Sequence, residues 1–139
     1  MRIVRRALLL AAALLLAGCA GLLPEAPTAP SQNAAVLALL DQAQAQRSAG
    51  QMEAAGASLE RALRIEPRNP VLWQELARVR LDQGQYRQAE NLAAKSNALA
   101  GDDKRLRPEN WRIIGQARSL LGDVQGAQAA FERAERERW

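Results

Sequence analysis

One recurring glycine-centred pattern constrains the fold of this 139-residue chain more than any other feature. Gly50, Gly84 and Gly122 each stand between two stretches in which apolar side chains recur every three or four residues. That spacing is typical of amphipathic helices. The glycines lie 34 and 38 residues apart (84 − 50 and 122 − 84). The sequence therefore predicts three helix–turn–helix units, which must stack because a single pair cannot bury its own apolar stripes.

Further positions repeat in register with these glycines. An alanine stands five residues after each glycine, and a tryptophan stands eleven residues before the second and the third. Small side chains let helices approach closely, and a larger residue there would overpack the core by about 1–3 kcal/mol. We expect structural roles at Gly50, Gly84, Gly122, Trp73, Trp111, Ala55, Ala89, Ala127 and Phe131.

The 34-residue period, together with Pro67 seventeen residues after Gly50, resembles the tetratricopeptide-repeat (TPR) family over residues 34–139. The resemblance implies an all-α, TPR-type α-solenoid of about three helix–turn–helix repeats, at about 36–69, 70–107 and 108–139. We expect residues 101–107 to form a solvated connector that takes up the longer second spacing. Pro108 is expected to open the helix that follows, since proline is favoured in a first turn.

The N-terminus has the features of a secretory signal peptide, predicted over residues 1–18. Three arginines precede an apolar run from Ala7 to Ala17, which is shorter than the ~20 residues of a membrane span. The run ends Leu16-Ala17-Gly18-Cys19 and resembles a bacterial lipobox. The resemblance implies cleavage before Cys19 and attachment of fatty acids, such as palmitate, which anchor a protein stably when two or more are present. An ordinary cleaved signal with an incidental cysteine remains the alternative.

Residues 19–33 contain three prolines among small residues and predict a disordered tether between the lipidated cysteine and the folded domain. Ala20 follows Cys19. By resemblance to the sorting rule of enterobacterial lipoproteins, alanine there implies the outer membrane rather than the inner one. We therefore expect a protein of the bacterial cell envelope, lipid-anchored at the outer membrane and facing the periplasm.

Composition argues against several classes of function. The net charge of +4 falls to +1 once three signal-peptide arginines are removed, and the remaining basic residues are interspersed with acidic ones, so no nucleic-acid partner is expected. The chain has no histidine and a single cysteine, which precludes an internal disulfide. The sequence contains none of the common catalytic or phosphate-binding motifs. We expect no enzyme activity, no metal site and no cofactor.

In TPR arrays the first helix of each repeat lines an inner groove, so the resemblance implies a binding surface there. Arg78 and Arg112 could hold a carboxylate in bidentate fashion. Leu40 and Gln44 stand where the carboxylate-clamping TPR subfamily begins its lysine and asparagine set, so that specific clamp is not expected. The alternative is that these side chains are merely solvated helix faces. The candidate groove residues are Asp41, Gln44, Arg47, Gln74, Arg78, Arg112 and Gln116.

TPR arrays bind many unrelated partners, so the resemblance limits the class of function without naming a ligand. We expect a non-catalytic adaptor or scaffold that binds a periplasmic or envelope protein as a peptide or a helix. Envelope assembly, a pilotin-like role and a scaffold for a peptidoglycan enzyme all remain open. The alternative is a self-associating structural lipoprotein that forms a homodimer through its last helix, which ends at Trp139 without a polar cap.

Overall fold

The computed structural model describes residues 30–138, and within that range it is helical without a strand. The predicted all-α, TPR-type solenoid is confirmed. The signal peptide, Cys19, most of the tether and Trp139 lie outside the described residues. The helices are α2 (Ala34–Ser48), α3 (Met52–Ile65), α4 (Pro70–Asp82), α5 (Tyr86–Leu99), α6 (Leu106–Leu120) and α7 (Val124–Arg136).

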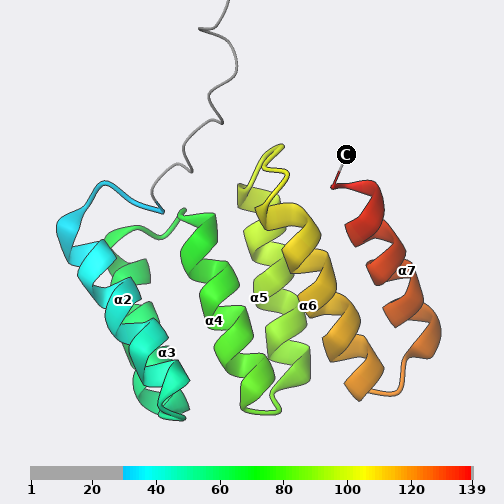
Figure 1. Cartoon of the computed structure of the whole chain (residues 1–139), viewed down its shortest axis with the longest axis horizontal. Coiled ribbons are helices and arrows are strands. Elements are labelled where there is room, and N and C mark those ends of the chain that lie inside the picture. The colour runs from blue at the N-terminus through cyan, green and yellow to red at the C-terminus, as the bar shows by residue number, and fades with distance from the viewer. Residues whose placement is uncertain (1–29, 139) are drawn as a thin grey trace, which may run out of the picture.

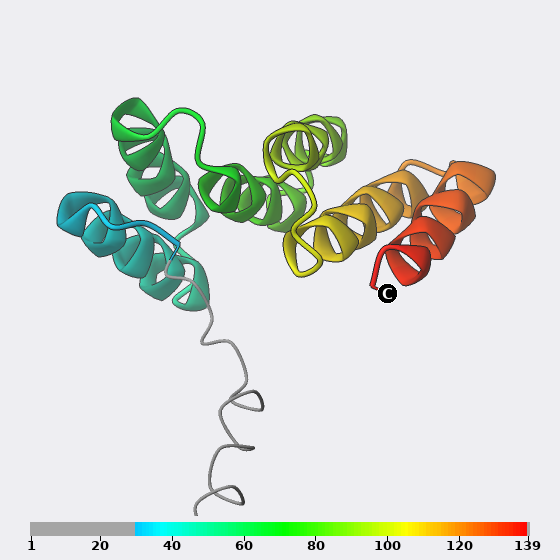
Figure 2. The same cartoon turned by 90° about the horizontal axis from the view of Figure 1, so that it is seen from above.

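These helices form three antiparallel hairpins, α2 with α3, α4 with α5 and α6 with α7 (Figure 1). The tight turns within hairpins lie at one end of the molecule, and the loops between hairpins lie at the other end. Seen from above, the hairpins follow a shallow arc, with α2, α4 and α6 on its inner side (Figure 2). The second helix of each hairpin packs on the first helix of the next, α3 on α4 and α5 on α6.

The three turn glycines share one backbone geometry. Gly50, Gly84 and Gly122 have φ angles of 76°, 75° and 84°, a left-handed conformation that disfavours any residue with a Cβ. In each turn the residue after the glycine donates its N–H to the carbonyl five residues before it, at 2.8, 2.8 and 2.9 Å. This is the Schellman closure of a helix, and it explains why the glycine spacing marks the hairpins.

Within each hairpin, the residue seven before the glycine faces the residue nine after it. The first two hairpins use Ala43 with Leu59 and Ala77 with Ala93, all of them buried. In the third hairpin these two positions hold Gly115 and Phe131, the smallest and the largest side chains of the set. A Cβ built on Gly115 would lie 2.5 Å from Cε1 of Phe131, so glycine is the residue that leaves room for the ring.

An asparagine side chain caps the N-terminus of α2 and another caps that of α4, the first helices of the first two hairpins. Asn33 Oδ1 accepts the N–H of Ala35 at 2.9 Å, and Asn69 Oδ1 accepts the N–H of Val71 at 3.0 Å. Both are N-caps of the ordinary kind. The expected start of the third hairpin at Pro108 is wrong by two residues, because α6 begins at Leu106. Asp103 Oδ1 accepts the N–H of Leu106 at 3.0 Å, and the proline falls inside the first turn, where it is tolerated.

The first junction between hairpins is apolar. Leu40 of α2, Ala62 and Leu63 of α3 and Leu72 of α4 share one core cluster, and none of them exceeds 8% exposure. Counted from the turn glycines, these residues stand at positions −10, +12, +13 and −12 of their hairpins.

The second junction holds polar side chains at the same four positions: Gln74, Ser96, Asn97 and Asn110. Asn110, fully buried, donates to Ser96 Oγ at 2.8 Å and to Asn97 Oδ1 at 3.0 Å, and accepts from Gln74 Nε2 at 2.9 Å. Ser96 Oγ in turn donates to the carbonyl of Pro70 at 2.8 Å. At these four positions a hydrogen-bonded network thus stands in place of apolar side chains, beside an apolar cluster in which Ala77, Ala93 and Ile114 still join α4, α5 and α6. We call these four side chains the polar junction.

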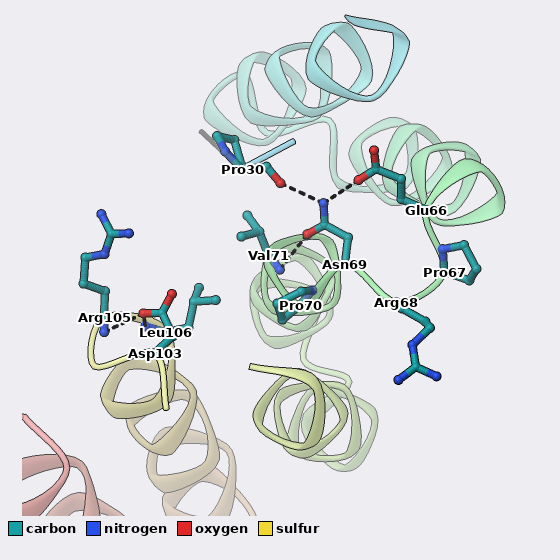
Figure 3. A pocket seen from close by; sticks show the side chains of 10 residues that line it. All are labelled: Pro30, Glu66, Pro67, Arg68, Asn69, Pro70, Val71, Asp103, Arg105 and Leu106. Carbon is teal, nitrogen blue, oxygen red and sulfur yellow. Dashed lines mark hydrogen bonds between the residues drawn. The ribbon is translucent and has the colours of Figure 1, made fainter. Parts of the chain in front are cut away.

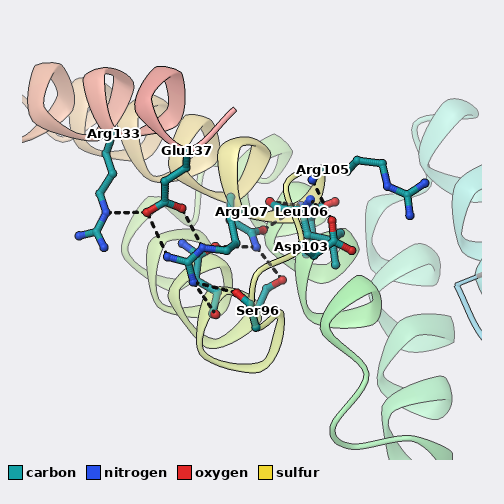
Figure 4. A network of polar contacts seen from close by, with 11 residues as sticks. Ser96, Asp103, Arg105, Leu106, Arg107, Arg133 and Glu137 are labelled. Atoms are coloured by element: carbon teal, nitrogen blue, oxygen red, sulfur yellow. Dashed lines mark hydrogen bonds and ion pairs between the residues drawn. The ribbon is translucent and has the colours of Figure 1, made fainter. Parts of the chain in front are cut away.

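An arginine extends the polar contacts to the last helix. Arg107 Nη1 donates to the carbonyls of Asn97 and Gly101 at 3.4 and 3.3 Å, and its guanidinium makes two bonds of 2.8 and 3.0 Å to Glu137 (Figure 4). Burial raises the pKa of Glu137, but hydrogen bonds from Arg107 and Arg133 outweigh it, and the net pKa is lowered. The end of α7 is therefore held against the loop between α5 and α6.

Candidate functional site in the inner groove

The inner side of the arc is formed by α2, α4 and α6, the helices expected to line the binding groove (Figure 2). Three of the residues predicted to line a binding groove, Asp41, Gln44 and Gln116, are exposed to solvent. A fourth, Arg47 near the end of α2, lies 2.6 Å from Asp82 of α4. Accessible polar groups therefore come from the first and third hairpins, and an ion pair links the first to the second.

The two central arginines of the predicted groove are paired with carboxylates. Arg78 lies 2.9 Å from Glu75 and 3.1 Å from Glu109, and Arg112 lies 3.3 Å from Glu109 and 3.1 Å from Glu135. Hydrogen bonding to Glu135, more than to Glu109, raises the pKa of Arg112. Together with Arg138, which lies 3.0 Å from Glu135, the groups form a row of alternating charges across α4, α6 and α7. We call this row the charge ladder.

The charge ladder changes what the groove can bind. A carboxylate ligand would have to replace a glutamate already held by each guanidinium, so the arginines are not a preformed anion clamp. The more exposed pairs, those of Arg112 with Glu109 and Glu135, contribute little to stability, so a partner that brings better contacts can displace them. Gln74 lies outside the accessible surface, at 5% exposure, because its amide is used within the polar junction and by the carbonyl of Leu106 at 3.2 Å.

A pocket of about 730 Å³ lies at the loop end of the molecule, among the first, second and third hairpins (Figure 3). Its apolar surface includes Val71 at the start of α4 and Leu106 at the start of α6. An opening of this size with an apolar lining suits one or two side chains of a bound peptide. The lining residues are Pro30, Glu66, Pro67, Arg68, Asn69, Pro70, Val71, Asp103, Arg105 and Leu106.

The chain that leads to the N-terminus is fastened to the rim of this pocket. Asn69 Nδ2 donates to the carbonyl of Pro30 at 2.8 Å and to Glu66 Oε2 at 2.7 Å (Figure 3). Ser31 Oγ donates to Glu66 Oε1 at 2.6 Å. The hydrogen bond from Ser31, followed by that from Asn69, lowers the pKa of Glu66. Because 35 residues separate Ser31 from Glu66, no local sequence signal identified this contact.

Two further properties concern metals and membranes. Between residues 30 and 138, no cluster of three or more histidine, cysteine or acidic side chains is arranged to hold a metal ion. None of the helices in the same range is long and apolar enough to cross a membrane.

Comparison with known proteins finds the same repeat architecture in a protein family and in solved structures. A tetratricopeptide-repeat family profile matches residues 46–107. The globular C-terminal domain of Pseudomonas aeruginosa LpoP is similar, with 42% sequence identity and a TM-score of 0.73, over 76% of this chain and 99% of that domain. The N-terminal domain of stress-induced protein-1 from Caenorhabditis elegans shares the fold, with a TM-score of 0.69 at 20% identity, over 77% of this chain and 90% of the other. No curated protein sequence matches significantly.

Proposed function

Because the chain belongs to the tetratricopeptide-repeat family of bacterial lipoproteins that includes LpoP, we propose that it is a lipid-anchored adaptor that binds a peptidoglycan enzyme in the periplasm and raises its activity. The observation that carries this proposal is the relationship to the LpoP domain. Among the adaptor roles that the sequence leaves open, that relationship favours the one at a peptidoglycan enzyme. The fold is that of a protein-interaction domain and points away from catalysis by the chain itself.

The geometry supports a groove that binds a peptide or a helix. Gln44 of α2 and Gln116 of α6 are exposed, and the pocket supplies apolar area at the loop end of the molecule. Exposed polar side chains beside a pocket with an apolar lining suit a short segment of a partner, bound as a peptide or a helix.

The attachment of Pro30 at the pocket rim has a consequence for a lipid-anchored protein. A fully extended chain spans at most ~3.5 Å per residue, so the residues from Cys19 to Pro30 reach at most about 40 Å. With lipid on Cys19 at the outer membrane, the groove would work within that distance of the periplasmic face. The bonds of Asn69 and Ser31 would fix the side of the domain from which the tether leaves.

Site-specific photocrosslinking in cells tests the adaptor role. A photoreactive residue at Gln44 or at Gln116 should crosslink a peptidoglycan synthase or hydrolase. The same residue at Arg87, exposed on the second helix α5, provides a matched control that should not. If no peptidoglycan enzyme is crosslinked from either groove position while all variants are stably produced, the adaptor role is refuted.

The anchor has a separate test. Mass spectrometry of the mature chain should find an N-terminal Cys19 carrying acyl chains. The Cys19→Ser variant should leave the membrane fraction. An unacylated mature chain that retains residues 1–18 would contradict the anchor and leave the groove experiment unaffected.

A further inference from the structure

One side of the last helix is only partly covered within residues 30–138: Phe131 packs on Gly115 and Glu135 pairs with Arg112, both of α6, but both side chains keep exposed area. Val124, Gln128, Phe131 and Glu135 follow one another at spacings of four, three and four residues, which places them on one side of α7. Val124 is 74% exposed and Phe131 39% exposed, and Leu121 in the preceding turn is 43% exposed. We call Leu121 and these four residues the end face.

The position of Phe131 is buried in each of the first two hairpins, and Met52 and Tyr86, which correspond to Val124, are half-buried there. Counted from the turn glycine, Phe131 corresponds to Leu59 and Ala93, which are 1% and 0% exposed. In both cases the next hairpin contributes its first helix to the cover. Leu59 shares a core cluster with Leu72 of α4, and Ala93 shares one with Ile114 of α6. The end face therefore continues a stacking surface that the molecule fills with a helix twice.

The two covering helices present the same pattern to their neighbours. Each has three buried side chains at spacings of four and three residues, and an arginine directly after the third. Arg80 Nη2 lies 2.7 Å from Glu60 of α3, and Arg118 Nη2 lies 2.7 Å from Glu90 of α5. The buried sets are Leu72, Leu76 and Val79 in α4, and Asn110, Ile114 and Ala117 in α6.

Helix α7 offers a carboxylate that matches the first interface, whereas Glu90 of the second stands four positions earlier, where α7 has Gln128. Glu132 stands ten residues after its turn glycine, as Glu60 does, and its side chain is 56% exposed. It accepts from Gln128 Nε2 at 3.2 Å and lies 3.8 Å from Arg136, contacts that a closer guanidinium can replace.

We propose that the end face binds one amphipathic helix of an envelope protein, which packs on α7 as α4 packs on α3. That helix carries apolar side chains at positions i, i+4 and i+7 and a basic residue at i+8. The inference is independent of the partner proposed for the groove, because it depends only on how the hairpins stack.

A second copy of this chain fits the end face poorly. The stacking positions of α2, the first helix of a following copy, hold Ala38, Gln42 and Ala45, and glutamine replaces the arginine. Those side chains bring little apolar area and no charge for Glu132. Two copies of α7 packed antiparallel would place the apolar half around Val124 against the charged half around Glu135.

Two matched peptides from this chain test the proposal with a defined probe. The first spans residues 69–83 and carries the pattern of α4; the second spans residues 33–49 and carries the small and polar face of α2. Both are constrained as helices by a lactam bridge, since isolated helices of about 15 residues are marginal in water. Binding to residues 30–139 is measured by fluorescence anisotropy. The corresponding domain of LpoP was solved separately, which supports the use of the isolated domain.

The α4 peptide should bind, and the α2 peptide should bind at least about tenfold more weakly, a difference of about 1.4 kcal/mol. Val124→Glu in the domain should weaken binding of the α4 peptide by a similar factor. The domain should keep its helicity, because the side chain of Val124 is exposed and an acidic residue is favoured at a helix N-terminus. Glu132→Arg should weaken binding, and an α4 peptide with Arg80→Glu should restore it.

Three results would overturn the proposal. They are equal binding of the two peptides, binding that Val124→Glu leaves unchanged, and a domain dimer that Val124→Glu dissociates, which would assign the end face to a second copy. Each is distinguishable from failure of the groove experiment, because no peptidoglycan enzyme is present in the assay.

Discussion

Replacing Asn110 by leucine probes the polar junction most directly. Leucine is the residue at the equivalent position of the first junction, so the substitution restores the apolar side chain of that repeat. It nevertheless removes three hydrogen bonds that the buried amide makes with Gln74, Ser96 and Asn97. The test is whether apolar burial compensates for partners that are left unsatisfied.

The structure allows the free-energy change to be estimated. Three neutral hydrogen bonds contribute about 1 kcal/mol each, and leaving Asn97 Oδ1 buried without its donor costs roughly another 1 kcal/mol. Burying leucine in place of the amide returns about 2 kcal/mol. We therefore expect Asn110→Leu to lower the free energy of unfolding by about 2 kcal/mol, although it makes the core more hydrophobic.

Changing the whole junction should reverse this effect. A quadruple variant gives all four positions the residues of the first junction, so no polar side chain of the junction is left without a hydrogen-bond partner. Its substitutions are Gln74→Leu, Ser96→Ala, Asn97→Leu and Asn110→Leu. The change also removes Asn97 Nδ2, a buried donor without a partner in the described structure. Replacing both sides of a buried polar contact by apolar groups is often neutral or stabilising. The quadruple variant should be at least as stable as the natural chain.

Urea unfolding of residues 30–139, followed by circular dichroism at a helix band, measures both variants. The single variant should lower the transition midpoint with an unchanged m value, and the quadruple variant should recover it. An Asn110→Leu variant as stable as the natural chain would show that the network contributes nothing. A quadruple variant less stable than the single one would refute the equivalence of the two junctions.

Two further predictions concern packing and pH. Gly115→Ala should destabilise the third hairpin by about 1–3 kcal/mol, because the added Cβ meets the Phe131 ring. Adding Phe131→Leu should restore stability, because the double variant then has the alanine and leucine of the first hairpin. Thermal unfolding measures both variants, and a Gly115→Ala variant that gains stability from its higher helix propensity would contradict the prediction. The lowered pKa of Glu66 means that its hydrogen bonds stabilise the fold above the unfolded-state pKa of about 4.5 and lose that effect as the pH falls through the folded-state pKa. Ser31→Ala should therefore flatten the stability profile below about pH 5, and a profile identical to that of the natural chain would contradict the assignment.

The sequence was informative wherever a feature repeats, and much less so where two repeats meet. The helix pairs follow from the glycines because each glycine supplies the one left-handed residue that a Schellman turn requires. The pairing of Arg78 with Glu109 joins residues 31 apart on different helices, and helical periodicity gives a face without identifying its neighbour. For the same reason Gln74 was predicted to face the groove, although its amide lies inside the polar junction.

The contrast between the two junctions determines the order in which the hairpins can stack. If α6 packed on α3, the amide of Asn110 would be buried against Ala62 and Leu63, which offer it no side-chain acceptor. If α4 of a second copy replaced α6 against α5, Leu72 would leave Ser96 Oγ and Asn97 Oδ1 without the amide that now donates to them. Either exchange costs roughly 1–3 kcal/mol for each unsatisfied group. Repeats with nearly identical backbones could otherwise slip or swap, so the polar junction specifies the register of the array even where it adds little net stability.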